Sequence, residues 1–362
     1  MWPYWILFFL TAYMALTSRS LISENLIAKS QKEWPRQWKC AFIYIVLMIG
    51  LRYEVGGDWY AYIEMLQSYY DGTSDQHGFQ DLGLVFVSKI SVLIGSDIYL
   101  LNLVCAFIFT WGLVKFCLSQ PLPWLALVSA VPYLITVVAM GYTRQAAAIG
   151  FSMFAMDALS KGGKIKFFMW IVLGCLFHKT CVILAPLAAL SNTKNKLMSV
   201  IWISLGTLIL YILFLQESID FLISGYIEAN YQSSGAGVRI SMNALPAIFF
   251  LIFRKRFYLN KQQHIFWISM AISSVLMVPM LFVSPSTTVV DRIGLYFIPI
   301  QIFVLSRLPI ILVDKITMRK YLIILLVIYN FLVLYIWLIF AETSFSWIPY
   351  RFYPWELVVK AF

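Results

Sequence analysis

The sequence predicts an all-α fold, a polytopic transmembrane helical bundle of about 10–12 spans with a re-entrant or broken helix pair. Hydrophobic residues fill 61% of the 362 positions and charged residues only 12%, whereas a soluble domain carries about 25% charge. Apolar runs that approach or reach the ~20 residues needed to cross a bilayer lie at residues 41–51, 124–140, 197–215 and 321–340. Because backbone amides in lipid must be satisfied within one segment, these runs indicate helices.

Basic residues mark one side of the membrane. They cluster in short loops at residues 19–39, 161–166, 194–196, 254–261 and 307–320. By the positive-inside rule, these loops face the cytoplasm. The net charge of +10 is therefore a topology signal, and we expect no nucleic-acid partner.

The chain changes sides at every crossing, and this condition places the N-terminus outside. The expected spans lie near residues 2–17, 40–51, 98–117, 122–140, 145–159, 197–215, 243–253, 263–283, 288–306 and 321–340. We expect the first run to be a mature helix, because it lacks the positive flank and cleavage site of a signal peptide. Residues 1–362 therefore form one membrane domain, without a soluble domain or an internal repeat.

Two segments do not fit as simple crossings. Residues 82–95 carry Lys89 in their middle, so we expect an interfacial or re-entrant helix there. Residues 167–190 run between basic residues and contain His178 near their centre. They form either two short crossings or a hairpin whose tip lies at membrane depth.

The five cysteines lie in or beside apolar runs and have no metal-ligand spacing. We expect them to be small apolar packing residues rather than disulfides or metal ligands.

The polar residues of interest fall at the outer ends of helices or in the outer segments 52–81, 216–243 and 341–362. They are Arg52, Asp58, Arg144, His178, Arg239, Asp291, Arg292 and Arg351. Arginine exceeds lysine on this side, and lysine exceeds arginine on the other. The planar guanidinium suits a bidentate grip on phosphate, so the arginines indicate a buried anion, for which a lipid pyrophosphate is the natural candidate in a membrane.

Residues 51–62 contain a glycine break after an apolar helix. Gly56 and Gly57 allow positive φ, so the backbone can turn Arg52 and Asp58 toward one cavity. The aromatic residues around them, among them Tyr53 and Tyr62, either line a sugar groove or belong to the aromatic belt at the membrane interface.

Arg144 stands near the start of a short helix, in Gly141-Tyr142-Thr143-Arg144-Gln145. Its charge adds to the positive end of the helix dipole, which is unfavourable for stability and favourable for binding phosphate. The alternative is a snorkelling arginine.

Four further candidate residues have plainer alternatives. Asp291 and Arg292 precede an apolar helix with Tyr296 one turn later, and they could equally form ion pairs with another helix. His178 is either a packing residue or a base. Arg239 follows the glycine- and serine-rich loop 231–237, expected to be mobile, and could simply snorkel.

Signatures of soluble enzymes are missing: the sequence contains no Walker loop, no His-Glu-x-x-His, no Gly-x-Ser-x-Gly and no Asp-x-Asp. We therefore expect neither an ATP-driven enzyme nor a nucleotide-sugar enzyme, and neither a cofactor nor a metal.

The pattern from Arg52 to Tyr62 resembles the opening signature of the EpsG family, whose members carry Arg-Tyr-x-x-Gly-x-Asp-Tyr-x-x-Tyr. Trp59 replaces the tyrosine after the aspartate and keeps an aromatic ring there. Three more blocks follow in the order of the family. They are Gly141-Tyr142-Thr143-Arg144-Gln145, Phe177-His178-Lys179-Thr180 followed by Pro186, and Asp291-Arg292 with Tyr296.

The resemblance implies a Wzy-type O-antigen or exopolysaccharide polymerase in the bacterial inner membrane, with the architecture of lipid-linked (GT-C-like) glycosyltransferases. Such an enzyme transfers a glycan from undecaprenyl pyrophosphate to the terminal sugar of another lipid-linked repeat unit, on the outer face. Its partners would be both lipid-linked oligosaccharides, membrane lipid and a chain-length regulator protein.

Roles follow from the chemistry of this transfer. We expect Arg144, Arg239 and Arg292 to bind pyrophosphate, because the leaving group's negative charge needs stabilisation. We expect Arg52 and Asp58 to position or deprotonate the acceptor, with His178 or Asp291 as the competing base.

Other functions remain open. A flippase for lipid-linked oligosaccharide would show basic residues along both halves of its path, and usually repeats. A glycan ligase or membrane O-acyltransferase differs in its product, since only a polymerase yields a ladder of repeat units.

Overall fold

The computed structural model describes residues 1–18, 34–73, 81–190 and 232–361, and over these it is helical without a β-strand. The prediction of an all-α fold is confirmed. The expected span at 197–215 and most of the outer segment 216–243 lie outside the described residues.

The helices of the first half carry three of the four motif blocks. In chain order they are α1 (Trp2–Thr17), α2 (Arg36–Gly50), α3 (Trp59–Tyr70), α4 (Leu82–Ile94), α5 (Asp97–Leu118), α6 (Pro123–Ala130), the π-helix η2 (Val131–Ala139), α7 (Thr143–Ser160), α8 (Lys164–Phe177), the 3₁₀-helix η3 (Lys179–Leu184) and α9 (Ala185–Leu190).

The second half carries the fourth block at the start of a broken helix. Its elements are α12 (Ala236–Phe253), η6 (Arg254–Phe257), α13 (Lys261–Val283), α14 (Thr287–Gly294), η7 (Leu295–Phe297), α15 (Pro299–Leu305), α16 (Leu308–Leu312), α17 (Ile316–Phe340), η8 (Glu342–Ser346) and α18 (Tyr353–Ala361).

Four helices of the described chain are long and apolar enough to cross a membrane: Asp97–Leu118, Ala236–Phe257, Lys261–Val283 and Ile316–Phe340. A fifth candidate is the pair Thr287–Phe297 and Pro299–Leu312, which is bent by 43°. The protein is therefore a multi-pass membrane protein. A broken helix pair is present, as the predicted fold class includes, but it lies where a simple span near residues 288–306 was expected.

Several other expected spans form shorter helices. Trp2–Thr17 and Pro123–Ala139 are apolar but too short to count as spans by length. The same holds for Leu82–Ile94, where an interfacial or re-entrant helix was expected. The helix α7 is only 18 residues long and almost entirely buried, so it lies inside the bundle rather than against lipid. Fewer helices than expected therefore qualify as full crossings, because apolar sequence marks burial in protein and burial in lipid alike.

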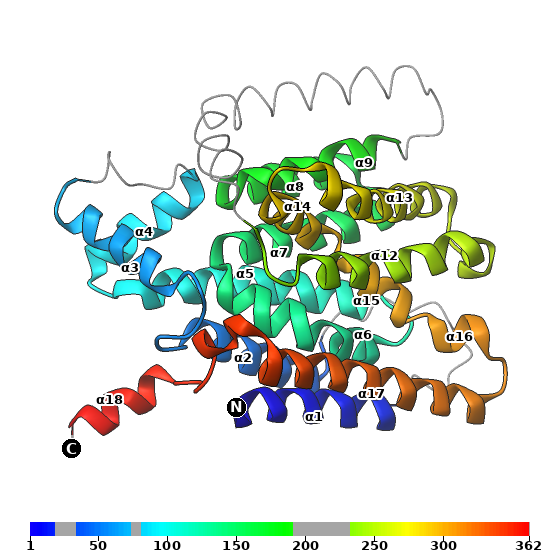
Figure 1. Ribbon diagram of the computed structural model, residues 1–362, viewed down its shortest axis with the longest axis horizontal. Helices are drawn as coiled ribbons and strands as arrows, with labels where there is room; N and C mark the ends of the chain where they lie inside the picture. Colours follow the sequence, from blue (N-terminus) through cyan, green and yellow to red (C-terminus); the bar gives the residue numbers. More distant parts are fainter. Residues whose placement is uncertain (19–33, 74–80, 191–231, 362) are drawn as a thin grey trace.

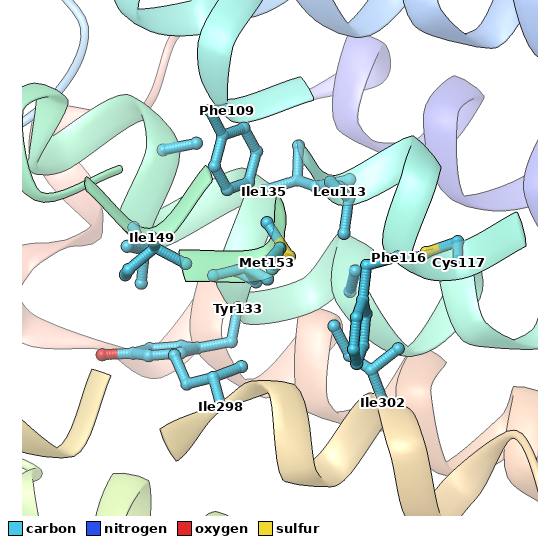
Figure 2. Packing of buried hydrophobic residues seen from close by; sticks show 14 of the residues in the cluster. Phe109, Leu113, Phe116, Cys117, Tyr133, Ile135, Ile149, Met153, Ile298 and Ile302 are labelled. Carbon is cyan, nitrogen blue, oxygen red and sulfur yellow. The ribbon is translucent and has the colours of Figure 1, made fainter. Parts of the chain in front are cut away.

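The core forms around α7, which lies between α5 and α8 (Figure 1). Figure 2 shows side chains from several elements packed together, among them Phe109 and Leu113 of α5, Ile135 of η2, Ile149 of α7 and Ile302 of α15. The bent helix and the central helix thus share one apolar core, which fixes the start of α7 relative to α14.

Two glycines let α5 and α7 approach closely. A Cβ atom added to Gly112 would lie 2.1 Å from the carbonyl oxygen of Gly150, and one added to Gly150 would lie 2.6 Å from Cα of Phe109. Small residues at such crossings are common where membrane helices pack.

Gly112→Ala is expected to lower the melting temperature of the detergent-solubilised protein, because the backbone of α7 cannot yield to the new methyl group. Gly237→Ala in α12 is the matched control, since nothing lies within 4 Å of a Cβ at that position. That control should be neutral or stabilising by up to about 1 kcal/mol. Equal behaviour of the two variants would argue against the close helix crossing.

The C-terminal segment covers the glycine break near Arg52. The backbone N–H of Tyr53 donates to the carbonyl of Arg351 (3.0 Å), and Tyr353 N–H donates to the carbonyl of Leu51 (2.9 Å). Arg52 and Phe352 form an isolated antiparallel bridge. Figure 1 places α17, which leads into this segment, beside α1. Residues 351–353 thus lie against residues 51–53 of the first motif.

Candidate active site

The glycine break brings the first two motif blocks into contact. Gly56 has φ of +107°, and a Cβ there would lie 2.1 Å from the carbonyl oxygen of Met140. A side chain is therefore excluded by conformation and by space. The close approach sets the segment that carries Asp58 directly against the turn that leads into Arg144.

Arg52 is fully occupied by the protein itself. The side chain is 1% exposed and donates to the carbonyls of Ile49 and Val55, and to the side chains of Asn102 (3.2 Å) and Thr143 (2.8 Å). These hydrogen bonds link the end of α2 to α5 and α7. The geometry makes Arg52 a residue that positions the break.

Asp58 is the half-buried residue before α3, and its carboxylate does not cap that helix. Burial raises the pKa of Asp58, while Arg292, Arg144 and Arg52 favour its charged form. Among the described residues it forms no ion pair. A carboxylate that three arginines surround, and that none of them binds directly, is available to a ligand.

Arg144 is held by a carboxylate that the sequence did not point to. Its Nη1 lies 2.8 Å from Oδ2 of Asp81, and its backbone N–H donates to the hydroxyl of Tyr62 (3.2 Å). The backbone of Lys179 also hydrogen-bonds to Asp81. Asp81 therefore joins the second motif block to the third, and burial raises the pKa of this carboxyl group against the effect of Arg144.

His178 sits where α8 ends and the chain folds back. Cys181 Sγ would lie 2.6 Å from a Cβ at Gly174, so η3 returns along the last turn of α8. This reversal is compatible with two short crossings and with a hairpin. Nδ1 of His178 hydrogen-bonds to the hydroxyls of Thr180 (2.6 Å) and Tyr296 (3.2 Å). These contacts fix the ring through Nδ1 and leave Nε2 without a partner among the described residues.

Arg292 lies over the ring of Tyr142, with its guanidinium carbon 3.7 Å from the ring centroid. Its carbonyl accepts a hydrogen bond from Nε2 of Gln145 (2.6 Å), which ties α14 to α7. The side chain forms no ion pair with any described carboxylate. Arg292 is thus oriented by an aromatic face while its hydrogen-bond donors stay open to an anion.

Arg239 and Asp291 form a bidentate ion pair. Nε and Nη2 of Arg239 each lie 2.8 Å from one oxygen of Asp291, and the hydroxyl of Ser233 donates to that carboxylate (3.0 Å). The ion-pair alternative for Asp291 matches this geometry. Arg239 keeps its Nη1 bonded to the carbonyl of Ser234 (2.9 Å), so both members are largely satisfied by protein.

Tyr142 connects Arg292 with the pair formed by Arg239 and Asp291. It is within electrostatic range of Arg292, Asp291, Arg239 and Asp58. His178 in turn interacts with Arg144 and Arg292. The structure therefore gathers most of the sequence-predicted site residues into one region. Arg351 lies apart, exposed and paired with Glu54.

Sequence reasoning missed three residues that hold this region: Asp81, Gln145 and Asn102. Gln145 and Asn102 are almost completely buried, and Gln145 Oε1 and Asn102 Nδ2 have no hydrogen-bond partner within the described part of the chain. A polar amide inside an apolar helix is a usable signal, and Asn102 in α5 fits it.

Over the described residues no group of three His, Cys, Asp or Glu side chains could hold a metal ion.

The five cysteines are free thiols, and all except Cys40 are buried, as expected from their apolar surroundings. They take no part in the site.

The sequence matches the EpsG family over residues 36–352, which include all four motif blocks and most of the chain. The chain belongs to the EpsG family. No curated protein and no solved structure matches it. Membership of the EpsG family confirms the resemblance and agrees with a polymerase-like role in polysaccharide synthesis at a membrane.

Proposed function

We propose that this EpsG-family protein is a polysaccharide polymerase that transfers a glycan from undecaprenyl pyrophosphate to the terminal sugar of a second lipid-linked repeat unit. The observation that carries the proposal is that Asp58 and His178 both lie within electrostatic range of Arg144 and Arg292, whose guanidinium stacks on Tyr142. It combines cations for a pyrophosphate with two candidate bases.

The donor side of the reaction rests on the arginines. When the bond between the anomeric carbon and the pyrophosphate breaks, negative charge develops on the leaving oxygen and needs preorganised donors. Arg292 has no carboxylate partner in the described chain and supplies the free charge. Arg144 and Arg239 are held in fixed positions by Asp81 and Asp291, and we assign them to orienting the pyrophosphate beside Arg292.

The acceptor side rests on Asp58. The acceptor hydroxyl oxygen forms the new bond to the anomeric carbon, and its proton passes to a base. We assign Asp58 as this base, Arg52 as the residue that positions its loop, and Tyr53 to contact with the acceptor sugar. Tyr62 is 1% exposed, and we assign it to holding the backbone of Arg144. His178 and Asp291 are the competing bases, and the ion pair with Arg239 makes Asp291 the weaker of the two. Tyr296 orients His178 through Nδ1.

Production of a ladder of repeat units tests the proposal. The full chain is expressed in cells that make lipid-linked repeat units but lack their own polymerase, and the lipid-linked glycans are separated by size. A ladder supports a polymerase. Delivery of single units to the outer face would support a flippase, and single units joined to another acceptor would support a ligase.

The location of the site on the outer face is testable by cysteine labelling. In a Cys40→Ser background, which removes the exposed native thiol, Thr343→Cys should react with an impermeant maleimide in intact cells. Lys261→Cys should react only after permeabilisation, because both positions are exposed but lie on opposite predicted sides. The reverse pattern would place the site on the cytoplasmic face.

A further inference from the structure

A cavity lies at the C-terminal end of α7, at the opposite end of this helix from Arg144. It has a volume of ≈ 800 Å³ and is lined by residues of α5, α7 and α8, among them four lysines: Lys115, Lys161, Lys164 and Lys166. The helix α7 begins beside Arg144 and ends at Ser160, so at 1.5 Å per residue the two regions are separated by roughly 25 Å. The cavity is therefore distinct from the candidate active site.

The charge of the cavity is strongly positive. The buried carboxylate of Asp157 pairs with Lys161 (2.7 Å), which leaves the other three lysines uncompensated among the lining residues. The helix α8 starts at the same place, and no side chain caps its first turn. Open backbone N–H groups and lysine ammonium groups together favour a phosphate.

Apolar side chains continue from the cavity along two helices. On α5, Trp111 and Phe107 lie one and two turns before Lys115 and are 43% and 44% exposed. On α8, Ile165 and Met169 are 88% and 46% exposed. Since α5 is a candidate membrane span, these surfaces face the hydrocarbon region at the place where a lipid's acyl chains would lie.

We propose that this cavity binds the phosphodiester head group of an anionic phospholipid, with the acyl chains along the exposed faces of α5 and α8. Basic pockets between membrane helices on the cytoplasmic side bind anionic head groups in this way. Trp170 stacks on Phe154 at the cavity wall (4.8 Å between centroids), which gives the site a rigid apolar side. The proposal is independent of the polymerase activity.

Native mass spectrometry of the detergent-solubilised full chain tests the proposal, with phosphatidylglycerol and phosphatidylcholine as probes. We expect the wild-type protein to retain phosphatidylglycerol in preference to phosphatidylcholine. The triple variant Lys115→Gln, Lys164→Gln and Lys166→Gln should bind it about a hundredfold more weakly, since each lysine near an anionic lipid contributes roughly a factor of five.

The matched control removes three exposed lysines from other cytoplasmic loops: Lys255→Gln, Lys261→Gln and Lys320→Gln. Equal losses in both triple variants would reduce the effect to net charge and overturn the site. Competition by glycerol phosphate at the same concentration as the lipid would show a site for free phosphate esters and overturn the lipid assignment.

Asp157→Asn provides a test that keeps all lysines, and it should tighten phosphatidylglycerol binding about fivefold. Unchanged or weaker binding would contradict the proposal.

Discussion

Replacement of Arg292 by lysine is expected to lower polymer formation by about 100-fold or more, while the protein still inserts into the membrane. Arg292 combines two properties that lysine lacks. Its planar guanidinium stacks on Tyr142 at 3.7 Å, and its fork can hold a pyrophosphate with two parallel hydrogen bonds. An ammonium group keeps the charge but loses the orientation.

The experiment needs a control for the general effect of exchanging arginine for lysine. Arg36→Lys is suitable, because Arg36 is exposed at the start of α2 and far from the motif blocks along the chain. Both variants should reach wild-type levels in the membrane fraction. A ladder of normal length and amount from Arg292→Lys would reduce Arg292 to a membrane anchor.

The second large effect is expected at Asp58. Asp58→Asn should stop polymer formation, a loss of about 10²–10⁴-fold for a general base, while binding of the lipid-linked donor is retained. His178→Ala should weaken donor binding as well, because His178 interacts with Arg144 and Arg292 on the donor side. Measuring donor binding and ladder formation on the same membranes separates the two roles.

The pH dependence offers an independent check on the base. Burial raises the pKa of Asp58, so this carboxylate becomes protonated at a pH above the ordinary aspartate pKa of about 3.9. Protonation removes its ability to act as a base. The rate of ladder formation should therefore fall as the pH drops through this raised value. If Asp58→Asn still builds a normal ladder and His178→Ala binds donor without making polymer, His178 is the base.

The sequence predicts the fold class and selects the candidate site residues for different reasons. Apolar composition sets the helical membrane fold almost by itself. Arg144, His178 and Arg292 could be selected because a charged or titratable residue at the end of an apolar run is costly without a function. The structure places Arg144 and Arg292 within electrostatic range of both Asp58 and His178, although the four residues come from separate parts of the chain.

The pairings inside the site could not be predicted. Asp81 lies 63 positions before Arg144, and only the packing of α4 near α8 makes them partners. The same holds for the bidentate contact between Arg239 and Asp291, 52 positions apart. Spacing along one helix reports which residues share a face, but it carries no information on which face of another helix will meet them.

The role expected for Arg52 shows the same limit. Its charge and its glycine-rich neighbourhood favoured direct contact with substrate. The structure instead satisfies its donors with two carbonyls and with Asn102 and Thr143. A conformationally special loop needs internal support, and an arginine with several donors supplies that support as readily as it binds a ligand.

The hydrogen bonds between the C-terminal segment and the first motif have a consequence for the biogenesis of the protein. The backbone N–H of Gly56 donates to the carbonyl of Ser346 (2.8 Å), and the hydroxyl of Tyr4 donates to the carbonyl of Trp347 (2.8 Å). These partners are synthesised last, long after the helices on either side of the loop have entered the membrane. Catalytic competence should therefore arise only after translation has passed Trp347, so a ribosome stalled earlier would carry an inserted but inactive chain.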